Sequence, residues 1–175
     1  MTTVLALDLA SISGWAVGEP GREPEHGSIR FASVGASHEA VFAGAFRWAI
    51  NVITEHQPTL IVWEAPLPTS FSRGRTTSDV TSLLFGLPAI IGCVAYQLGI
   101  YDIRKADTRD VRNHFIGRNP KRAEAKKLVM SQCRQMGWFV TDDNEADACA
   151  VWSYMCSLLN PKLAVRPTPL FGRRT

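Results

Sequence analysis

The short apolar run TLIVWEAP, at residues 59–66, constrains the fold more than any other stretch of the sequence. It is rich in large and β-branched apolar residues and is bounded by Pro58 and Pro66, a pattern that favours a fully buried parallel strand over a helix. The strand should end at Glu64. Because neighbouring parallel strands need crossover connections, the run predicts an α/β sheet with helices packed on it.

The rest of the chain supplies the other strands and helices of such a sheet. Turn-rich segments separate three strands that should pair antiparallel, at residues 4–9, 15–19 and 27–34, and a further strand is expected at 100–106. Helical spacing of apolar residues predicts helices at 38–56, from a cap at Ser78 or Asp79 to about Leu98 with a bend at Gly86 and Pro88, at 108–115, 121–137 and 145–159. The fold class is therefore α/β, with a mixed five-stranded sheet flanked by helices.

Length and composition favour one domain. A chain of 175 residues, 46% of them apolar, can bury one core, which we place at residues 1–159, ahead of an extended Pro- and Arg-rich tail at 160–175. The net charge of +3 is too small to identify a nucleic-acid partner. Lysine and arginine nevertheless gather between residues 73 and 127, which favours a basic face over an evenly charged surface.

Cysteine spacing and hydropathy exclude several classes of protein. The four cysteines show no C-x-x-C spacing, so we expect reduced core residues rather than a zinc site or a disulfide framework. The longest apolar stretch is interrupted by Gly and Pro, and no secretory leader opens the chain. We therefore expect a soluble, cytoplasmic protein with no membrane partner.

Carboxylates stand at three places where a buried element ends or packs. Asp8 and Glu64 each close an apolar strand, at the edge where open α/β sheets place their sites. Asp143 and Asp147 are spaced to share one face of the last helix. The helix dipole accounts for acidic residues in the first turn, but Asp147 lies a turn further in, between small residues that allow close packing.

An oxygen-only set of this kind predicts a magnesium or manganese site. The candidate ligands have no His or Cys companion, which fits Mg²⁺ or Mn²⁺ and excludes a typical zinc site. Pairs of such ions, about 4 Å apart, serve in phosphodiester hydrolysis. Together with the basic region, the carboxylates favour a nuclease.

Three stretches resemble the motifs of RuvC-type Holliday junction resolvases. VLALDLASISGWAV resembles the opening strand and hairpin of that family, LIVWEAP its second acidic motif, and DDNEADACAVW the acidic motif on its last helix. The EADA core is similar to the phage and prophage branch. The resemblance implies a ribonuclease H-like fold, a homodimer, two Mg²⁺ ions per active site and symmetric incision of a four-way junction, in a bacterial or phage-infected cell.

Residue by residue, the resemblance assigns Asp8, Glu64 and Asp147 as catalytic, metal-binding carboxylates. The family commonly has Asp three residues before the last of these, where this chain has Asn144. We therefore assign the fourth position to Asp143, with Glu145 as the weaker candidate. A lysine that assists catalysis would be Lys121, Lys126 or Lys127, and we favour Lys126.

The expected DNA contacts lie in two segments. Residues 69–78 combine Arg73 and Arg75 with hydroxyl side chains that suit a phosphate backbone. Some family members carry an aromatic wedge shortly after the second acidic residue, where this chain has Leu67, with Phe71 nearby. The second segment contributes Lys121, Arg122, Lys126 and Lys127. The apolar helix that ends near Leu98 packs either in the core or against both the sheet and a partner subunit.

Other functions stay open at this point. One alternative is a ribonuclease H-like nuclease that acts on RNA:DNA hybrids, flaps or other branched DNA. An actin-like kinase is disfavoured because the chain lacks a second domain and a second phosphate loop. A non-catalytic module that binds branched DNA is disfavoured because carboxylates buried without a ligand only destabilise a fold.

Overall fold

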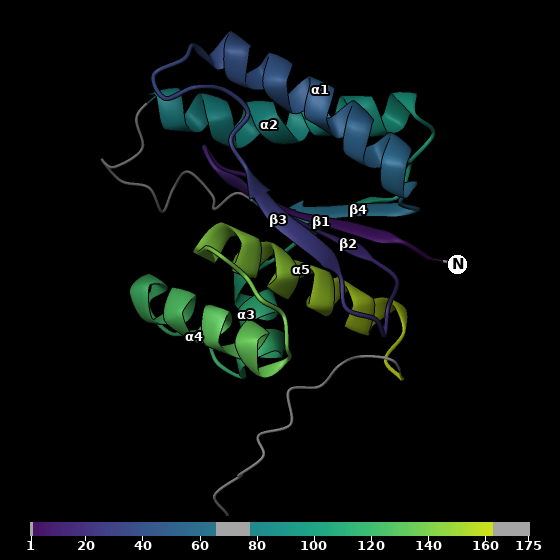
Figure 1. The fold of residues 1–175 in the computed structure, drawn as a ribbon, viewed down its shortest axis with the longest axis vertical. Helices are drawn as coiled ribbons and strands as arrows, with labels where there is room; N and C mark the ends of the chain where they lie inside the picture. The colour runs from purple at the N-terminus through teal and green to yellow at the C-terminus, as the bar shows by residue number, and fades with distance from the viewer. Residues whose placement is uncertain (1, 66–77, 163–175) are drawn as a thin grey trace, which may run out of the picture.

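The computed structural model describes residues 2–65 and 78–162, and places five strands and five helices there (Figure 1). The strands are β1 (Val4–Asp8), β2 (Ser13–Gly18), β3 (Glu25–Ile29), β4 (Leu60–Glu64) and β5 (Ile103–Ala106). The helices are α1 (His38–His56), α2 (Ser78–Gln97), α3 (Thr108–Ile116), α4 (Arg122–Gln135) and α5 (Asp143–Leu159).

The strands form one mixed sheet in the order β3-β2-β1-β4-β5. The first three strands pair antiparallel, whereas β4 runs parallel to both β1 and β5. This topology confirms the predicted fold class. The buried run that ends at Glu64 is the parallel strand β4, and it lies beside β1 near the middle of the sheet.

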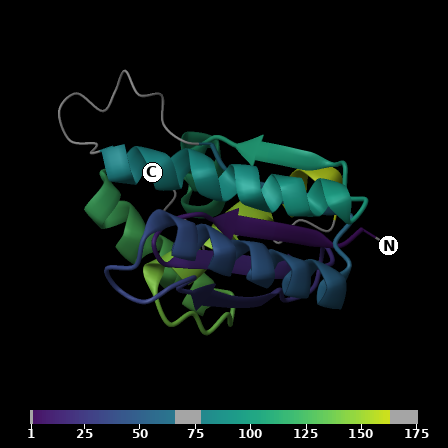
Figure 2. The ribbon, with the colours of Figure 1, turned by 90° about the horizontal axis from the view of Figure 1, so that it is seen from above.

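Helices cover both faces of the sheet. Helices α1 and α2 lie on one face, and α3, α4 and α5 lie on the other (Figures 1 and 2). Because side chains alternate along a strand, Leu5 and Ile61 face α1 and α2 whereas Ala6 and Val62 face α5. The two central strands are buried on both faces, which explains why their sequences are apolar without alternation.

The third strand differs from its prediction. We expected strand structure over residues 27–34, but β3 begins at Glu25 and ends at Ile29. Ile29 pairs with Ser13, the first residue of β2, so the ladder has no partner strand beyond that point. The side chain of Phe31 packs instead in a small apolar cluster with Ala45 of α1 and Leu87 of α2.

Helix α2 has two apolar sides. Leu87, Ile91 and Ala95 are buried, whereas the large side chains of Phe85 and Tyr96 are exposed. The helix continues through Pro88. Among the described helices, α2 alone has the length and hydropathy to cross a membrane, a test that core helices of water-soluble proteins also pass.

The cysteines are reduced in the described part of the chain, but they are not all in the core. Cys133, Cys149 and Cys156 are buried, as expected, and Cys93 on α2 is exposed. The expectation of four core cysteines is therefore wrong for Cys93. Apolar spacing on α2 did not reveal which of its faces meets solvent.

Candidate active site at the carboxyl ends of the central strands

Two carboxyl groups meet at one edge of the sheet because the strands that carry them are parallel. Asp8 is the last residue of β1 and Glu64 the last residue of β4. The pairing of Leu7 with Trp63 brings the two ends into the same register. Both side chains are partly buried, at the edge where parallel sheets of this type form their sites.

Helix α5 brings a third carboxyl group to this edge. Gly14 lies opposite Asp8 on β2, and a Cβ atom at Gly14 would overlap the carbonyl oxygen of Asn144. The absence of a side chain at Gly14 therefore lets the first turn of α5 lie directly on the strand. Asp147 follows Asn144 by three residues, and it interacts electrostatically with Asp8 and Glu64.

Burial raises the pKa of all three carboxyl groups, and neighbouring carboxylates raise it further at Asp8 and Asp147. Burial, followed by repulsion from Asp147 and Glu64, raises the pKa of Asp8 to about 8. Burial and repulsion from Glu64 raise the pKa of Asp147 to about 6. Burial also raises the pKa of Glu64, and a 3.0 Å hydrogen bond from the Thr108 hydroxyl opposes this rise. Ionising all three groups in the metal-free protein is therefore unfavourable, chiefly because they are buried.

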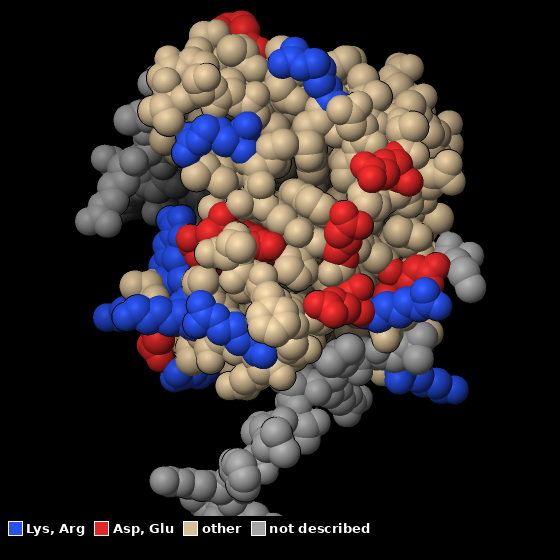
Figure 3. Space-filling model, in the orientation of Figure 1, with Lys and Arg blue, Asp and Glu red and all other residues tan. Residues whose placement is uncertain are grey.

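Cations of α3 and α4 reduce this repulsion in part. Lys126 and Arg122 lower the pKa of Asp8, and Arg112 lowers those of Glu64 and Asp147. Lysine and arginine side chains gather over the region of α4, next to acidic side chains near the start of α5 (Figure 3). The carboxyl groups at the sheet edge thus lie beside a basic surface (Figure 3).

Asp143 has a different partner from the other three carboxylates. It is the first residue of α5, and Lys126 of α4 donates a hydrogen bond to it. The pair joins the expected fourth ligand to the favoured catalytic lysine. In this arrangement Asp143 is oriented by Lys126 rather than by Asp8 and Glu64.

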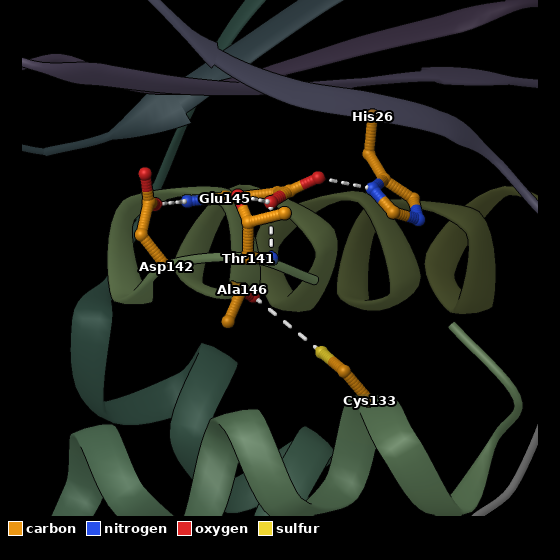
Figure 4. A network of polar contacts seen from close by, with 6 residues as sticks. All are labelled: His26, Cys133, Thr141, Asp142, Glu145 and Ala146. Carbon is orange, nitrogen blue, oxygen red and sulfur yellow. Dashed lines mark hydrogen bonds and ion pairs between the residues drawn. The ribbon is translucent and has the colours of Figure 1, made fainter. Parts of the chain in front are cut away.

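Glu145, the weaker candidate for the fourth ligand, points towards β3. It is 4% exposed, and it accepts hydrogen bonds from the backbone N–H and the hydroxyl of Thr141. Its other carboxylate oxygen lies 2.6 Å from Nδ1 of His26 on β3 (Figure 4). Its acceptor sites are used within the fold, away from the carboxylate edge.

The donor set fits a hard divalent cation, although the side chains do not converge on one point. Among residues 2–65 and 78–162, no three His, Cys, Asp or Glu side chains are gathered closely enough to hold a metal ion as they stand. Asp8, Glu64 and Asp147 offer only oxygen atoms; burial raises the pKa of all three, and repulsion from neighbouring carboxylates adds to the rise at Asp8 and Asp147. A cation between them would relieve this repulsion, so the residues fit Mg²⁺ or Mn²⁺.

The remaining predicted contacts fall into two groups. Leu67, Phe71, Arg73 and Arg75 lie outside the described residues. Lys121 precedes α4, and Arg122, Lys126 and Lys127 lie in its first turns, with Lys126 the least exposed of the four.

Four residues near the site carried no predicted site role, although Arg112 lies within the predicted basic region: Gly14, His26, Thr108 and Arg112. Thr108 had a usable signal, because it follows the short strand β5 just as Asp8 and Glu64 close their own strands. Arg112 lies one helical turn after Thr108 and so shares its face. His26 and Gly14 had no such signal, since their roles depend on α5 packing across β2 and β3.

Comparisons with known proteins identify the fold. No family model matches the sequence, and no curated protein matches it. Among solved structures, Thermus thermophilus RuvC in complex with a Holliday junction substrate is similar, with a TM-score of 0.69 and 11% identity over 95% of this chain and 98% of that chain. A second T. thermophilus RuvC structure gives a TM-score of 0.67 and 12% identity over 94% and 98%. The yeast mitochondrial Holliday junction resolvase Ydc2 gives 0.56 and 12% over 89% and 79%.

The comparisons and the topology together define the class of fold. A mixed five-stranded sheet with helices on both faces, similar to these structures, is a ribonuclease H-like fold. Within that class the chain has the RuvC-like form, since RuvC structures cover nearly all of it. At 11–12% identity, the likeness concerns the fold.

Proposed function

We propose that this chain is a metal-dependent, structure-selective endonuclease that resolves four-way DNA junctions by paired, symmetric phosphodiester hydrolysis. The observation that carries the proposal is the meeting of Asp8, Glu64 and Asp147, from three different elements, at one edge of a RuvC-like fold. Uncompensated carboxyl groups lower stability, so their concentration at one edge favours a site that binds something positive.

The proposed cofactor is a pair of Mg²⁺ ions in each active site, for which Mn²⁺ substitutes. Asp8, Glu64 and Asp147 would hold them, with Asp143 joining once Lys126 releases it. When bound, such ions supply Lewis-acid chemistry for phosphodiester hydrolysis. Because carboxyl groups must be ionised to bind a metal, the raised pKa values make metal binding compete with protons.

The chain's own residues orient these ligands and the substrate. The Thr108 hydroxyl fixes one oxygen of Glu64, and the contact with Lys126 holds Asp143 in reserve until Lys126 releases it. Arg112 and Arg122 act on the carboxyl groups electrostatically, so they are placed to contact a DNA phosphate near them. Lys126, when released from Asp143, would stabilise the charge that develops on the reacting phosphate.

The proposed partners are branched DNA and a second copy of the chain. Lys121, Arg122, Lys126 and Lys127 form the described part of the proposed DNA-binding surface, and the predicted contacts Phe71, Arg73 and Arg75 lie outside the described residues. The exposed apolar side of α2 would form the subunit contact, since two opposed active sites are needed for symmetric incisions. The proposed setting is the cytoplasm of a bacterial or phage-infected cell.

A substrate panel tests the proposal. The wild-type chain is incubated with a labelled four-way junction, linear duplex, flap or RNA:DNA hybrid, in Mg²⁺ or in EDTA. We expect metal-dependent nicks, symmetrically placed on opposite strands of the junction, and slower or no cutting of the linear duplex. Cutting of the hybrid alone would instead identify a ribonuclease H activity. Tight junction binding without cutting would identify a non-catalytic DNA-binding protein.

A further inference from the structure

Glu145 forms the best-connected buried polar contact near the carboxylate site, and the proposed reaction gives it no task. Its carboxylate is held by the Thr141 N–H at 2.6 Å, the Thr141 hydroxyl at 2.7 Å and His26 at 2.6 Å (Figure 4). Thr141 lies in the segment before α5, and His26 lies on β3. One side chain therefore ties the start of α5 to the preceding segment and to an antiparallel strand.

These contacts reinforce the cap of α5. Asp142 is the N-cap residue, and its carboxylate accepts a 2.9 Å hydrogen bond from the backbone N–H of Glu145. Glu145 reaches back in turn to Thr141, one residue before the cap, in a variant of the reciprocal capping box. Close packing of Asn144 on Gly14 fixes the same turn against β2. The first turn is thus held at the cap, on β2 and on β3.

The contacts of Glu145 affect the position of Asp147, because the two side chains lie on opposite sides of α5. Residues two apart on an α-helix point about 160° away from each other, so Glu145 and Asp147 lie on opposite sides of α5. An anchor on one side sets the rotation of the helix about its axis, and so sets where the opposite side chain points. A rotation of about 20° would displace a carboxyl group near the helix surface by about 2 Å.

We propose that Glu145 is a positioning residue, which holds α5 in the rotation that places Asp147 beside Asp8 and Glu64. The inference rests on the proposed metal-dependent function of that edge. Glu145 contacts none of these three carboxyl groups itself, and it acts through Thr141 and His26.

A purely structural role predicts a different result. If Glu145 only stabilised the fold, its loss would lower the melting temperature and leave the metal affinity of the folded protein unchanged. Met155→Ala is a matched control, because Met155 is buried on the same helix about two turns beyond Asp147. That change creates a cavity and lowers stability without touching the first turn. Glu145→Gln is the conservative variant, because its amide retains an acceptor for Thr141 and a donor for His26.

The experiment measures Mn²⁺ affinity by electron paramagnetic resonance, without DNA, in folded wild type, Glu145→Leu, Glu145→Gln and Met155→Ala. Amide hydrogen exchange at residues 143–147 is recorded beside it. We expect Glu145→Leu to bind Mn²⁺ about 10-fold more weakly and to exchange faster in the first turn of α5. Glu145→Gln and Met155→Ala should bind close to wild type. Thr141→Val, which removes only the hydroxyl contact, should weaken binding less, and it replaces Glu145→Leu if that variant does not fold.

The outcomes separate this inference from the proposed function. Wild-type Mn²⁺ affinity in Glu145→Leu or, where that variant does not fold, in Thr141→Val would overturn the positioning role and leave the nuclease proposal intact. Equal weakening in Met155→Ala would also overturn it, because general destabilisation would then explain the effect. If the wild type neither binds Mn²⁺ nor cuts a junction, the proposed function fails and the positioning role fails with it.

Discussion

Asp8 is the residue whose ionisation should reveal the carboxylate site most simply. Its pKa is raised from 3.8 to about 8, so the folded protein retains a proton that the unfolded chain releases near pH 4. Folding is therefore favoured at low pH, and this stability is lost as pH rises from about 4 to about 8. In metal-free protein, Asp8→Asn should become more stable than wild type across that window, by an amount that grows towards pH 8 and reaches several kcal/mol.

Urea unfolding in EDTA at pH 5, 6.5 and 8 measures this difference. Asp110→Asn is the control, because Asp110 is an exposed carboxylate on α3 and should leave the pH dependence unchanged. Parallel pH profiles for wild type and Asp8→Asn would show that folding does not raise the pKa of Asp8. Added Mg²⁺ should reduce the advantage of the variant at pH 8, since the wild type gains more from binding the ion.

Arg112 should contact DNA phosphate beside the carboxylates. Arg112→Gln should weaken junction binding and lower the slope of log affinity against log salt by about 1. The matched control is Arg109→Gln on the same helix, because Arg109 is exposed and lies 3.7 Å from the carboxylate of Asp110. Binding is measured in EDTA so that no cleavage occurs. Equal slopes for wild type and Arg112→Gln would exclude the contact.

Gly14 should be intolerant of any side chain. Alanine there would push the backbone of α5 away from β2, because its Cβ atom would overlap the Asn144 carbonyl. We expect Gly14→Ala to lower the free energy of unfolding by about 2–3 kcal/mol and to reduce junction cleavage. Gly92→Ala on α2 is the control, since its Cβ atom would meet Trp63 at an ordinary 3.7 Å. Thermal melting of both variants tests this prediction. Equal melting temperatures would contradict the close approach of Asn144 to Gly14.

At the scale of elements, sequence patterns predicted what depends on local spacing. Apolar periodicity located the strands that end at Asp8 and Glu64 and the helix over residues 38–56. The predicted end of β3 was wrong because β3 ends where its partner strand β2 begins, at the pair Ile29 and Ser13. The residues of β3 alone do not indicate where β2 begins. The last helix was expected from residue 145 but begins at Asp143, since Asp142 supplies the cap.

Helix α2 carries a prediction about assembly. Phe85 is 51% exposed on its outward side, and we propose that a second copy of the chain covers it. Phe85→Glu should convert a dimer into a monomer in sedimentation velocity and uncouple the two incisions. Phe46→Glu on α1 is the control, because Phe46 is 48% exposed on the neighbouring helix. A wild type that sediments as a monomer, with and without a junction, would contradict the proposed subunit contact.

At the scale of the whole molecule, the candidate site was only partly predictable. Strand ends identified Asp8 and Glu64, because parallel strands that end together bring their last residues together. The contact between His26 and Glu145 joins residues 119 positions apart, and no local pattern reports it. The pairing of Asp143 with Lys126 likewise depends on how α4 packs against α5. Motif spacing located the acidic residues. It did not predict that Asp143 pairs with Lys126, or that Glu145 is buried against His26 away from Asp8 and Glu64.

Mg²⁺-dependent cleavage of one four-way junction, labelled on each strand in turn, shows whether Asp8 and Asp147 belong to the active site. Wild type is compared with Asp8→Asn, Asp147→Asn and Asp110→Asn under single-turnover conditions, with junction binding measured in parallel. We predict symmetric nicks for wild type and Asp110→Asn, and no detectable nicks for Asp8→Asn and Asp147→Asn, although both still bind the junction. Cleavage by Asp8→Asn at the wild-type rate would show that these carboxylates are not the active site.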